Sequence, residues 1–366
     1  MLLRELIPVL ETLAPPELAE SWDNTGLLLG DQGANVDRVL TCLTLTPDVA
    51  LEAVQQHVQL VVTHHPLMFK PIQQITADTV AGRTLWTLAS HGIAVYSPHT
   101  AWDNAPQGIN QQIAEQLGLT DIRPLRPRSV PLGFKLTTTL PETDLEAVQQ
   151  ALWGAGCGEL GEYSQCSFFA SGTGTFRGSD VSQPTIGVPG RWEQVAEYRL
   201  EVLCPESRLS AAIAALRAAH SYEEPVIDVF PLHPVPDGTG SGRAGNLPQP
   251  LPLRELAQQV ANKWGASAIQ WVGDETKLVH RLGIACGAAA EFWKDARRDG
   301  CQALLTGEAR FHAGLEVRDA GFAMIVAGHD ATERFAMQRF AELLTSACPQ
   351  LTASASEVER DPFQSA

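Results

Sequence analysis

Several features that would assign this chain to a specialised class are missing from its sequence. Among its 366 residues, no uncharged apolar run approaches the roughly 18 residues that span a bilayer, so we expect no membrane partner. The N-terminal stretch carries Arg4 and Glu5 among its apolar residues and lacks the basic, then apolar, then small-residue order of a signal peptide. We interpret it as an amphipathic helix.

Basic residues are also scarce. The chain has 26 Lys and Arg against 42 Asp and Glu, which gives a formal net charge of −16. This charge argues against a protein whose main partner is a nucleic acid or an anionic membrane. A local basic pocket or a bound cation could still receive an anionic ligand.

Cysteine motifs and nucleophile motifs are absent as well. The seven cysteines are scattered, odd in number and contain no C-x-x-C pair, so we expect core residues of a protein in the reducing cytoplasm. There is no G-x-S-x-G elbow and no convincing Cys/His pair, which makes covalent nucleophilic catalysis a poor hypothesis.

What the sequence does contain is an internal repeat. Residues 39–65 align without gaps with residues 282–308 at a constant offset of 243, and residues 95–103 align with 325–333 at an offset of 230. Each copy has the pattern of an apolar strand, a helix and a further apolar strand. The pattern predicts an α/β fold with a duplicated core and a mainly parallel sheet. Chance similarity between short βα units is the alternative explanation.

A different region separates the two copies. It lies between two Pro-rich joints, and its apolar patterning predicts the order βαββαβ, which is typical of a ferredoxin-like domain. We therefore predict a discontinuous core of residues 1–125 and 237–366, interrupted by an inserted domain of residues 126–236.

Polar residues gather where the predicted strands end. His64 and His65 follow an apolar strand, and ligands of parallel sheets collect at the carboxyl ends of the strands. Neighbouring histidines at a turn past the strand can serve two metal ions side by side. Taken alone, they could equally be a solvated pair in a turn.

A His-x-x-x-acid pattern occurs at two further strand ends. His99 and Asp103 form one pair, and His329 and Glu333 form the other, each spaced by one helical turn. One such pair could be an ordinary helix-surface pair. Two pairs at equivalent strand ends, together with the two adjacent histidines, favour a metal cluster.

Imidazoles and carboxylates with no cysteine nearby suit zinc, ferrous iron or manganese, which the sequence does not distinguish. A bridging carboxylate with four or more other ligands indicates two divalent ions and metal-assisted hydrolysis.

Glu308 and His312 stand at the strand end equivalent to the two adjacent histidines, where they could act as a general base or support a ligand. A helix cap and a buried histidine are the alternatives. An Asx-type turn is sufficient to explain Asp23 unless it lies beside the metals.

With ESWDNTGLLLGD, VVTHHPLMFKPI, SPHTAWDNAPQGINQQIAEQLGL and LLTGEARFH followed by MIVAGHDATERF, the chain resembles the Nif-three-like family, often labelled GTP cyclohydrolase type 2 homologues. The resemblance covers nearly the whole chain. The insert, with FFASGTGTFRG and HSYEEPVIDVFPL, looks like the PII-like domain of the family's long bacterial members. Asp330 departs from the family pattern, which has an aromatic residue there, and Ala313 stands where an aspartate is common.

The resemblance implies an α/β core that binds two divalent metals and assembles as a toroidal homohexamer with its sites facing an internal cavity. Its motifs imply a set of metal ligands, with Glu333 as the bridge, made up of His64, His65, Asp103, His329 and Glu333. The family pattern leaves His99 outside the ligand set, as a neighbour that supports it.

These observations support a metal-dependent hydrolase of a small nucleotide-like or phosphorylated substrate. The cyclohydrolase activity itself rests on the resemblance alone. The alternative is a regulatory or metal-handling protein whose inserted domain senses an effector. A third possibility, DNA binding inside the toroid, conflicts with the net charge of −16 unless basic residues such as Arg123, Arg126 and Arg128 cluster there.

Overall fold

The computed structural model describes residues 1–130, 133–233, 235–266 and 268–364. The chain divides into two compact units. Unit 1 is formed by Met1–Arg128 and Gly238–Ala366, and unit 2 by Ser129–Asp237. The first joint follows Arg128, so Arg126 belongs to the first unit, where its Nε donates a hydrogen bond of 2.7 Å to Asp295 Oδ2. Near the joints, residues 131–132 and 234 lie outside the described part of the chain.

The first sheet of unit 1 has the strand order β1-β4-β3-β2-β17. Strands β17, β2, β3 and β4 are parallel, and β1 pairs antiparallel with β4. The strands are β1 (Gly26–Leu29), β2 (Arg38–Cys42), β3 (Leu60–Thr63), β4 (Ala94–Ser97) and β17 (Thr352–Ala355). The helices that accompany it are α1 (Leu3–Leu13), α2 (Pro47–Gln55), α3 (Val80–Ser90), α4 (His99–Asn104), α5 (Ile109–Gln116) and α12 (Phe335–Ala347).

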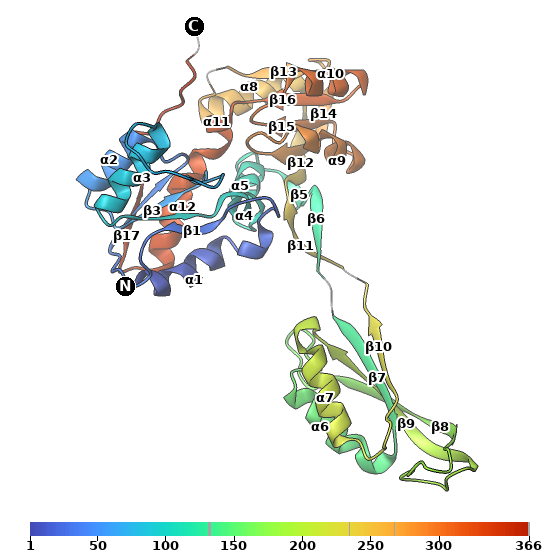
Figure 1. Ribbon diagram of the computed structural model, residues 1–366. Helices are drawn as coiled ribbons and strands as arrows, with labels where there is room; N and C mark the ends of the chain where they lie inside the picture. Colours follow the sequence, from blue (N-terminus) through green and yellow to red (C-terminus); the bar gives the residue numbers. More distant parts are fainter. Residues whose placement is uncertain (131–132, 234, 267, 365–366) are drawn as a thin grey trace. The chain divides into compact units, whose positions relative to one another are not determined.

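Both faces of this sheet are covered. The expected amphipathic helix forms as α1, with Leu3, Leu6 and Leu10 buried on one side, and together with α12 it packs against one face (Figure 1). Helix α2 and helix α3 cover the other face. Burial on both faces explains why β3 and β4 are buried along their whole length.

The second sheet of unit 1 has the order β13-β16-β15-β14-β12-β5. Strands β14, β15 and β16 are parallel, and the other neighbours pair antiparallel. The strands are β5 (Thr120–Arg123), β12 (Arg243–Pro252), β13 (Gln270–Val272), β14 (Leu278–Ala285), β15 (Ala303–Thr306) and β16 (Ala323–Val326). The helices are α8 (Leu253–Trp264), α9 (Trp293–Arg298), α10 (Phe311–Asp319) and α11 (His329–Glu333).

The two sheets share a strand register. Val39 of β2 pairs with Leu60 of β3, and Leu282 of β14 pairs with Ala303 of β15, so the two pairings differ by the constant offset of 243 seen in the sequence. In both sheets the third parallel strand leads into a short helix, α4 or α11, that begins with a histidine. This repetition brings two His-x-x-x-acid helices into one unit.

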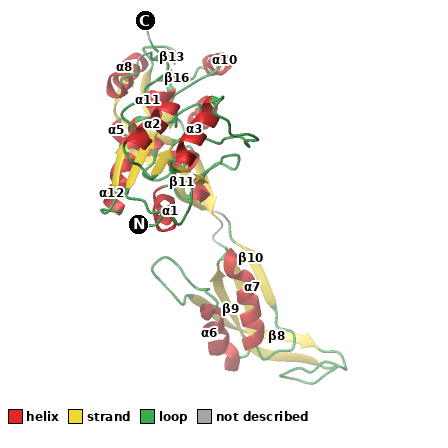
Figure 2. Ribbon diagram, turned by 60° about the vertical axis from the view of Figure 1, so that its left-hand side comes forward, coloured by secondary structure: helices red, strands yellow, loops and turns green. Residues whose placement is uncertain are grey.

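Unit 2 contains an antiparallel sheet with the order β10-β7-β9-β8. Helices α6 and α7 lie side by side over one face of this sheet (Figure 2). The chain order is β7 (Phe134–Leu140), α6 (Leu145–Gly154), β8 (Ser167–Arg177), β9 (Trp192–Cys204), α7 (Leu209–Ala219) and β10 (Ile227–Pro231). Strands β6 (Arg126–Val130) and β11 (Val235–Ser241) form a separate two-stranded sheet.

The molecule is thus a mixed α/β protein. Within the described residues, none of the helices is long and apolar enough to cross a membrane. The longest helix of unit 1, α12, has 13 residues.

The interior of unit 1 predicts the effect of one substitution. The Phe340 ring of α12 lies 4.8 Å from the Trp102 ring of α4, centroid to centroid, and both side chains are fully buried. Because Phe340→Ala removes this packing, we expect it to lower the free energy of unfolding of unit 1 by about 3–5 kcal/mol, measured by urea denaturation. The control Phe363→Ala, at a position 79% exposed, should change it by less than about 0.5 kcal/mol. Equal losses in both variants would contradict the assigned core.

Candidate metal centre

Strand ends and helix starts of unit 1 position the candidate ligands. His64 and His65 extend β3, and their backbone N–H groups donate to Cys42 O and Leu43 O, each at 2.8 Å. Ser97 Oγ at the end of β4 donates to His64 O at 2.7 Å, which fixes the turn. The histidine pair is therefore held by both neighbouring strands of the sheet.

The other candidates stand on the two short helices. His99 and Asp103 lie on α4, and His329 and Glu333 lie on α11. The structure brings all five predicted ligands together with His99. They form three overlapping groups whose ligand atoms lie within 4.8 Å of one another: His65, His329 and Glu333; His64, Asp103 and Glu333; and His64, His65 and His99.

Glu333 is the centre of this cluster. Its Oε2 lies 3.0 Å from His329 Nε2, 3.1 Å from His65 Nε2 and 3.9 Å from His64 Nε2. The residue is only 3% exposed. Gly287, with φ of +62°, passes so close that a Cβ there would lie 2.1 Å from Glu333 Oε1, so this position requires glycine.

Two of the cluster's rings are partnered within it, and one is not. His65 Nε2 and His329 Nε2 each lie within hydrogen-bond distance of Glu333 Oε2, and they face each other at 3.2 Å. His64 is 1% exposed, and within the described part of the chain neither of its ring nitrogens has a hydrogen-bond partner. Buried polar atoms nearly always have a partner. A divalent cation between these imidazoles and the shared carboxylate would give a His64 nitrogen such a partner.

The outer nitrogens of three rings are held by polar neighbours. His65 Nδ1 lies 2.7 Å from Thr44 Oγ1, and His329 Nδ1 lies 2.7 Å from Glu308 Oε1. His99 Nδ1 lies 2.7 Å from Asp23 Oδ1. Such partners orient imidazoles so that the opposite nitrogen points to a metal.

Four further residues were singled out in the sequence near the candidate ligands. Glu308 supports His329, in line with the supporting role considered for it. His312, in contrast, is exposed at the start of α10, where its ring contacts Phe311, and it is not among the described residues that line the cavity beside the cluster. Asp23 is more than part of a turn, because it fixes His99. His99 in turn belongs to one of the three donor groups, whereas the family resemblance leaves it outside the ligand set as a supporting neighbour.

The expectation that no cysteine lies nearby was wrong. Cys286, just after β14, donates a hydrogen bond of 3.1 Å from its Sγ to Asp103 Oδ1. Burial, with the nearby charge of Asp103, raises the pKa of the Cys286 thiol well above its ordinary value, so it is a neutral donor here. No local sequence pattern predicts this contact, because the two residues are 183 positions apart.

Burial and neighbouring charges shift the ionisation of the cluster. Burial would raise the pKa of Glu333, but hydrogen bonds from His329 and His65 outweigh it and hold that pKa far below its usual range. Burial and the Glu333 charge raise the pKa of Asp103 to about 7. Burial opposes protonation of His329, yet its bonds to Glu333 and Glu308 raise its pKa to about 9. The metal-free cluster therefore keeps a proton on His329 where a metal could replace it.

A cavity of about 280 Å³ adjoins the cluster. Among its lining residues are His65, His99, Asp103, His329 and Glu333. Arg126 also lines it, with its guanidinium 3.7 Å from the Phe292 ring centroid and its Nε bonded to Asp295. The cavity therefore presents both the candidate ligands and one fixed cation.

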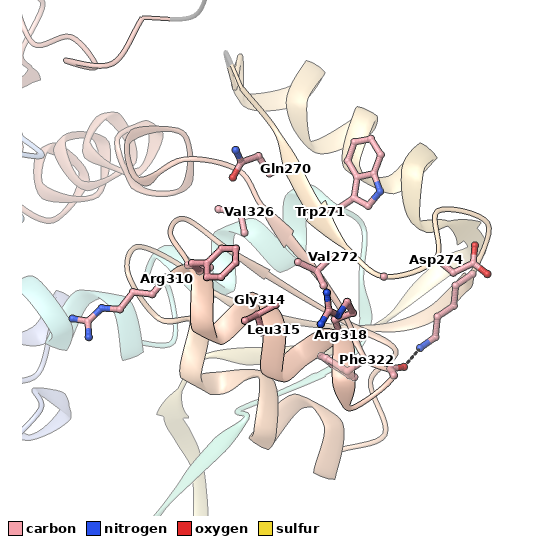
Figure 3. A pocket seen from close by; sticks show the side chains of 15 residues that line it. Gln270, Trp271, Val272, Asp274, Arg310, Gly314, Leu315, Arg318, Phe322 and Val326 are labelled. Carbon is pink, nitrogen blue, oxygen red and sulfur yellow. Dashed lines mark hydrogen bonds between the residues drawn. The ribbon is translucent and has the colours of Figure 1, made fainter.

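A larger cavity of about 920 Å³ lies between β13 and α10 (Figure 3). Val272, Leu315 and Phe322 form part of its apolar lining, and Lys277 Nζ at its rim donates to Gly321 O at 3.0 Å. Its described lining residues include none of the cluster's donors. We therefore assign the candidate chemistry to the smaller cavity.

Comparison with known proteins places these features in context. A family model described as Duf34/NIF3 (NGG1p interacting factor 3) matches residues 1–362. The chain is 37% identical over 350 residues to a Mycobacterium tuberculosis protein named GTP cyclohydrolase 1 type 2 homolog, covering 94% of this chain and 91% of that protein. A Bacillus subtilis protein of the same name is 32% identical over 364 residues, covering 98% and 97%.

Solved structures give the same result. A Bacillus cereus protein described as related to NIF3 is 30% identical with a TM-score of 0.75, and the match covers 100% of this chain and 99% of that one. A Staphylococcus aureus protein is 25% identical with a TM-score of 0.86 over the same shares.

The raised pKa of His329 predicts a pH dependence. Its folded-state value of about 9 exceeds its ordinary value of 6.5, so its contribution to stability is complete below pH 6.5 and is lost as pH rises through 9. We expect the unfolding temperature of the metal-free protein, measured in a chelator, to fall across this window and to fall less in His329→Gln. His312→Gln should behave as wild type. An equal fall in His329→Gln would contradict the assigned interactions.

Proposed function

We propose that this chain, which belongs to the Duf34/NIF3 family, is a dinuclear metal-dependent hydrolase of a small nucleotide-like or phosphorylated substrate. The observation that carries the proposal is the convergence of His64, His65 and His329 on the buried Glu333 carboxylate, with both ring nitrogens of the buried His64 unpartnered within the described residues. Hydrogen bonds to Glu333 account for the orientation of the other two rings, but no hydrogen bond among the described residues accounts for His64.

The overlapping donor groups suggest how two ions would be shared. His65, His329 and Glu333 would hold one ion, and His64, Asp103 and Glu333 would hold the other. Imidazole and carboxylate donors suit zinc, ferrous iron or manganese. When bound, such ions supply Lewis-acid polarisation and lower the pKa of water.

The chain's own residues prepare the site for an anionic substrate. Glu308 holds His329 through Nδ1, and Asp23 holds His99 in the same way. Arg126 uses its Nε for Asp295 and lines the cavity, where its terminal nitrogens would bind an anionic group. Two divalent ions would offset the acidic cluster and permit that anion to approach.

The larger architecture also belongs to this proposal. The common register of β2–β3 and β14–β15 supports a duplicated core, and the order βαββαβ supports a PII-like insert. Assembly as a homohexameric toroid follows from the family resemblance and stays a prediction.

Elemental analysis tests the metal assignment. We expect near two divalent ions per chain in the wild type and almost none in the double variant His65→Ala, Glu333→Ala, because it removes ligands of both ions. Circular dichroism should show that the double variant keeps its fold. Full metal occupancy in the double variant would overturn the assignment.

Hydrolysis of GTP and p-nitrophenyl phosphate by the metal-loaded wild type then tests catalysis. Turnover that is lost in Glu333→Ala would support the hydrolase. Two metals with no turnover on either substrate would favour a regulatory or metal-handling protein instead.

Arg126 provides a test of substrate charge. A hydrogen bond to a charged group contributes about 1.5–3 kcal/mol, so Arg126→Gln should raise KM for p-nitrophenyl phosphate about 10-fold or more. It should change kcat little, because Arg126 contacts none of the metal ligands in the described structure. Arg123→Gln is the matched control, since Arg123 pairs with Asp299 and is not among the described lining residues of the cavity. An unchanged KM in Arg126→Gln would exclude this role.

A further inference from the structure

A buried carboxylate lies behind the candidate metal centre. Glu359, in the segment that follows β17, is 7% exposed. Its Oε2 accepts the backbone N–H of Leu43 at 2.9 Å, and its Oε1 accepts the N–H of Thr44 at 2.5 Å. One side chain therefore fixes two consecutive amides of the loop after β2.

That loop orients a candidate ligand. The Thr44 hydroxyl lies 2.7 Å from His65 Nδ1, which leaves His65 Nε2 facing Glu333 at 3.1 Å. Leu43 O accepts the N–H of His65 at 2.8 Å. Glu359 therefore holds both backbone and side-chain contacts of His65, although it touches neither ring nitrogen.

The same segment also reaches the helix that carries Glu333. Arg334, the next residue, donates from its terminal nitrogen to Ser356 O at 3.1 Å, and its Nε lies 3.7 Å from Glu359 Oε2. Glu359 and Ser356 therefore connect the loop behind His65 with the residue that follows Glu333. Contacts from this one segment therefore hold both the loop behind His65 and the helix that carries Glu333.

The second sheet provides an internal comparison. At the equivalent strand end, the N–H of Cys286 donates to Asn110 Oδ1 at 2.9 Å, and the N–H of Gly287 donates to Thr332 Oγ1 at 3.2 Å. At that strand end two neutral side chains accept the two consecutive amides, whereas Glu359 accepts both of its amides alone. Burying a charged carboxylate is costly, and the nearby Arg334 guanidinium offsets part of that cost.

We propose that Glu359 is a positioning residue of the metal centre, which sets metal affinity by holding His65 and the Glu333 helix in their relative arrangement. The inference rests on the proposed metal site. It assigns a determinant of metal binding to a residue that is not a ligand. Substituting a residue that orients a metal ligand typically lowers metal affinity by about 10- to 100-fold.

Zinc affinity of the full chain, stripped of metal and titrated against a chromogenic chelator, tests the inference. Glu359→Ala should weaken zinc binding about 10-fold or more. Glu359→Gln, which keeps only one of the two acceptor oxygens and loses the charge that faces Arg334, should recover affinity only in part. Thr44→Val should also weaken binding, because it removes the partner of His65 Nδ1. Because Thr44 is exposed, we expect Thr44→Val to fold even if Glu359→Ala does not, and its zinc affinity then tests the inference.

Asp144 of unit 2 is the matched control. It is also buried, and its carboxylate accepts bonds from the backbone N–H of Ser221 at 2.8 Å and from Thr143 Oγ1 at 3.1 Å. Asp144→Ala should destabilise unit 2 and leave zinc affinity unchanged.

Unchanged affinity in folded Glu359→Ala or in Thr44→Val would overturn the inference and leave the metal site intact. An equal loss of affinity in Asp144→Ala would also overturn it. A wild-type chain that binds no zinc would overturn both the inference and the proposed function.

Discussion

The Glu333 carboxylate is the constraint around which the candidate site is arranged. It is almost fully buried, and His329, His65 and His64 all direct a ring nitrogen toward its Oε2. Removing a charge from water is costly unless nearby charges and hydrogen bonds compensate. The two sheets provide that compensation by placing their strand ends and short helices around one point. In the metal-free protein, a proton on His329 helps to balance this carboxylate, and a divalent cation could take its place.

Much of this arrangement could be predicted from local sequence patterns. Apolar strands buried on both faces produce continuous apolar runs, and a helix start with two residues one turn apart produces His-x-x-x-acid. His64, His65, Asp103, His329 and Glu333 carry such patterns because each belongs to an element with its own periodicity. The internal repeat of the sequence predicted that these residues would converge, because it placed them at matching strand ends.

The supporting contacts could not be predicted, because they join residues with no local pattern. Asp23 and His99 are 76 positions apart, and Glu359 lies 316 positions from Leu43. Cys286 was expected in a core, yet its thiol meets Asp103 at the site. Each of these contacts depends on how the chain folds back on itself. Arg126, likewise, lay on the predicted boundary of the insert, and its contacts with Asp295 and Phe292 tie it to unit 1.

The most direct test of the shared carboxylate is anomalous X-ray diffraction from crystals of the zinc-loaded full chain, recorded on both sides of the zinc absorption edge. The account predicts two anomalous peaks per chain, both within bonding distance of the Glu333 carboxylate, one beside His65 and His329 and the other beside His64 and Asp103. Peaks bound only to surface histidines, or no peak at Glu333, would contradict it.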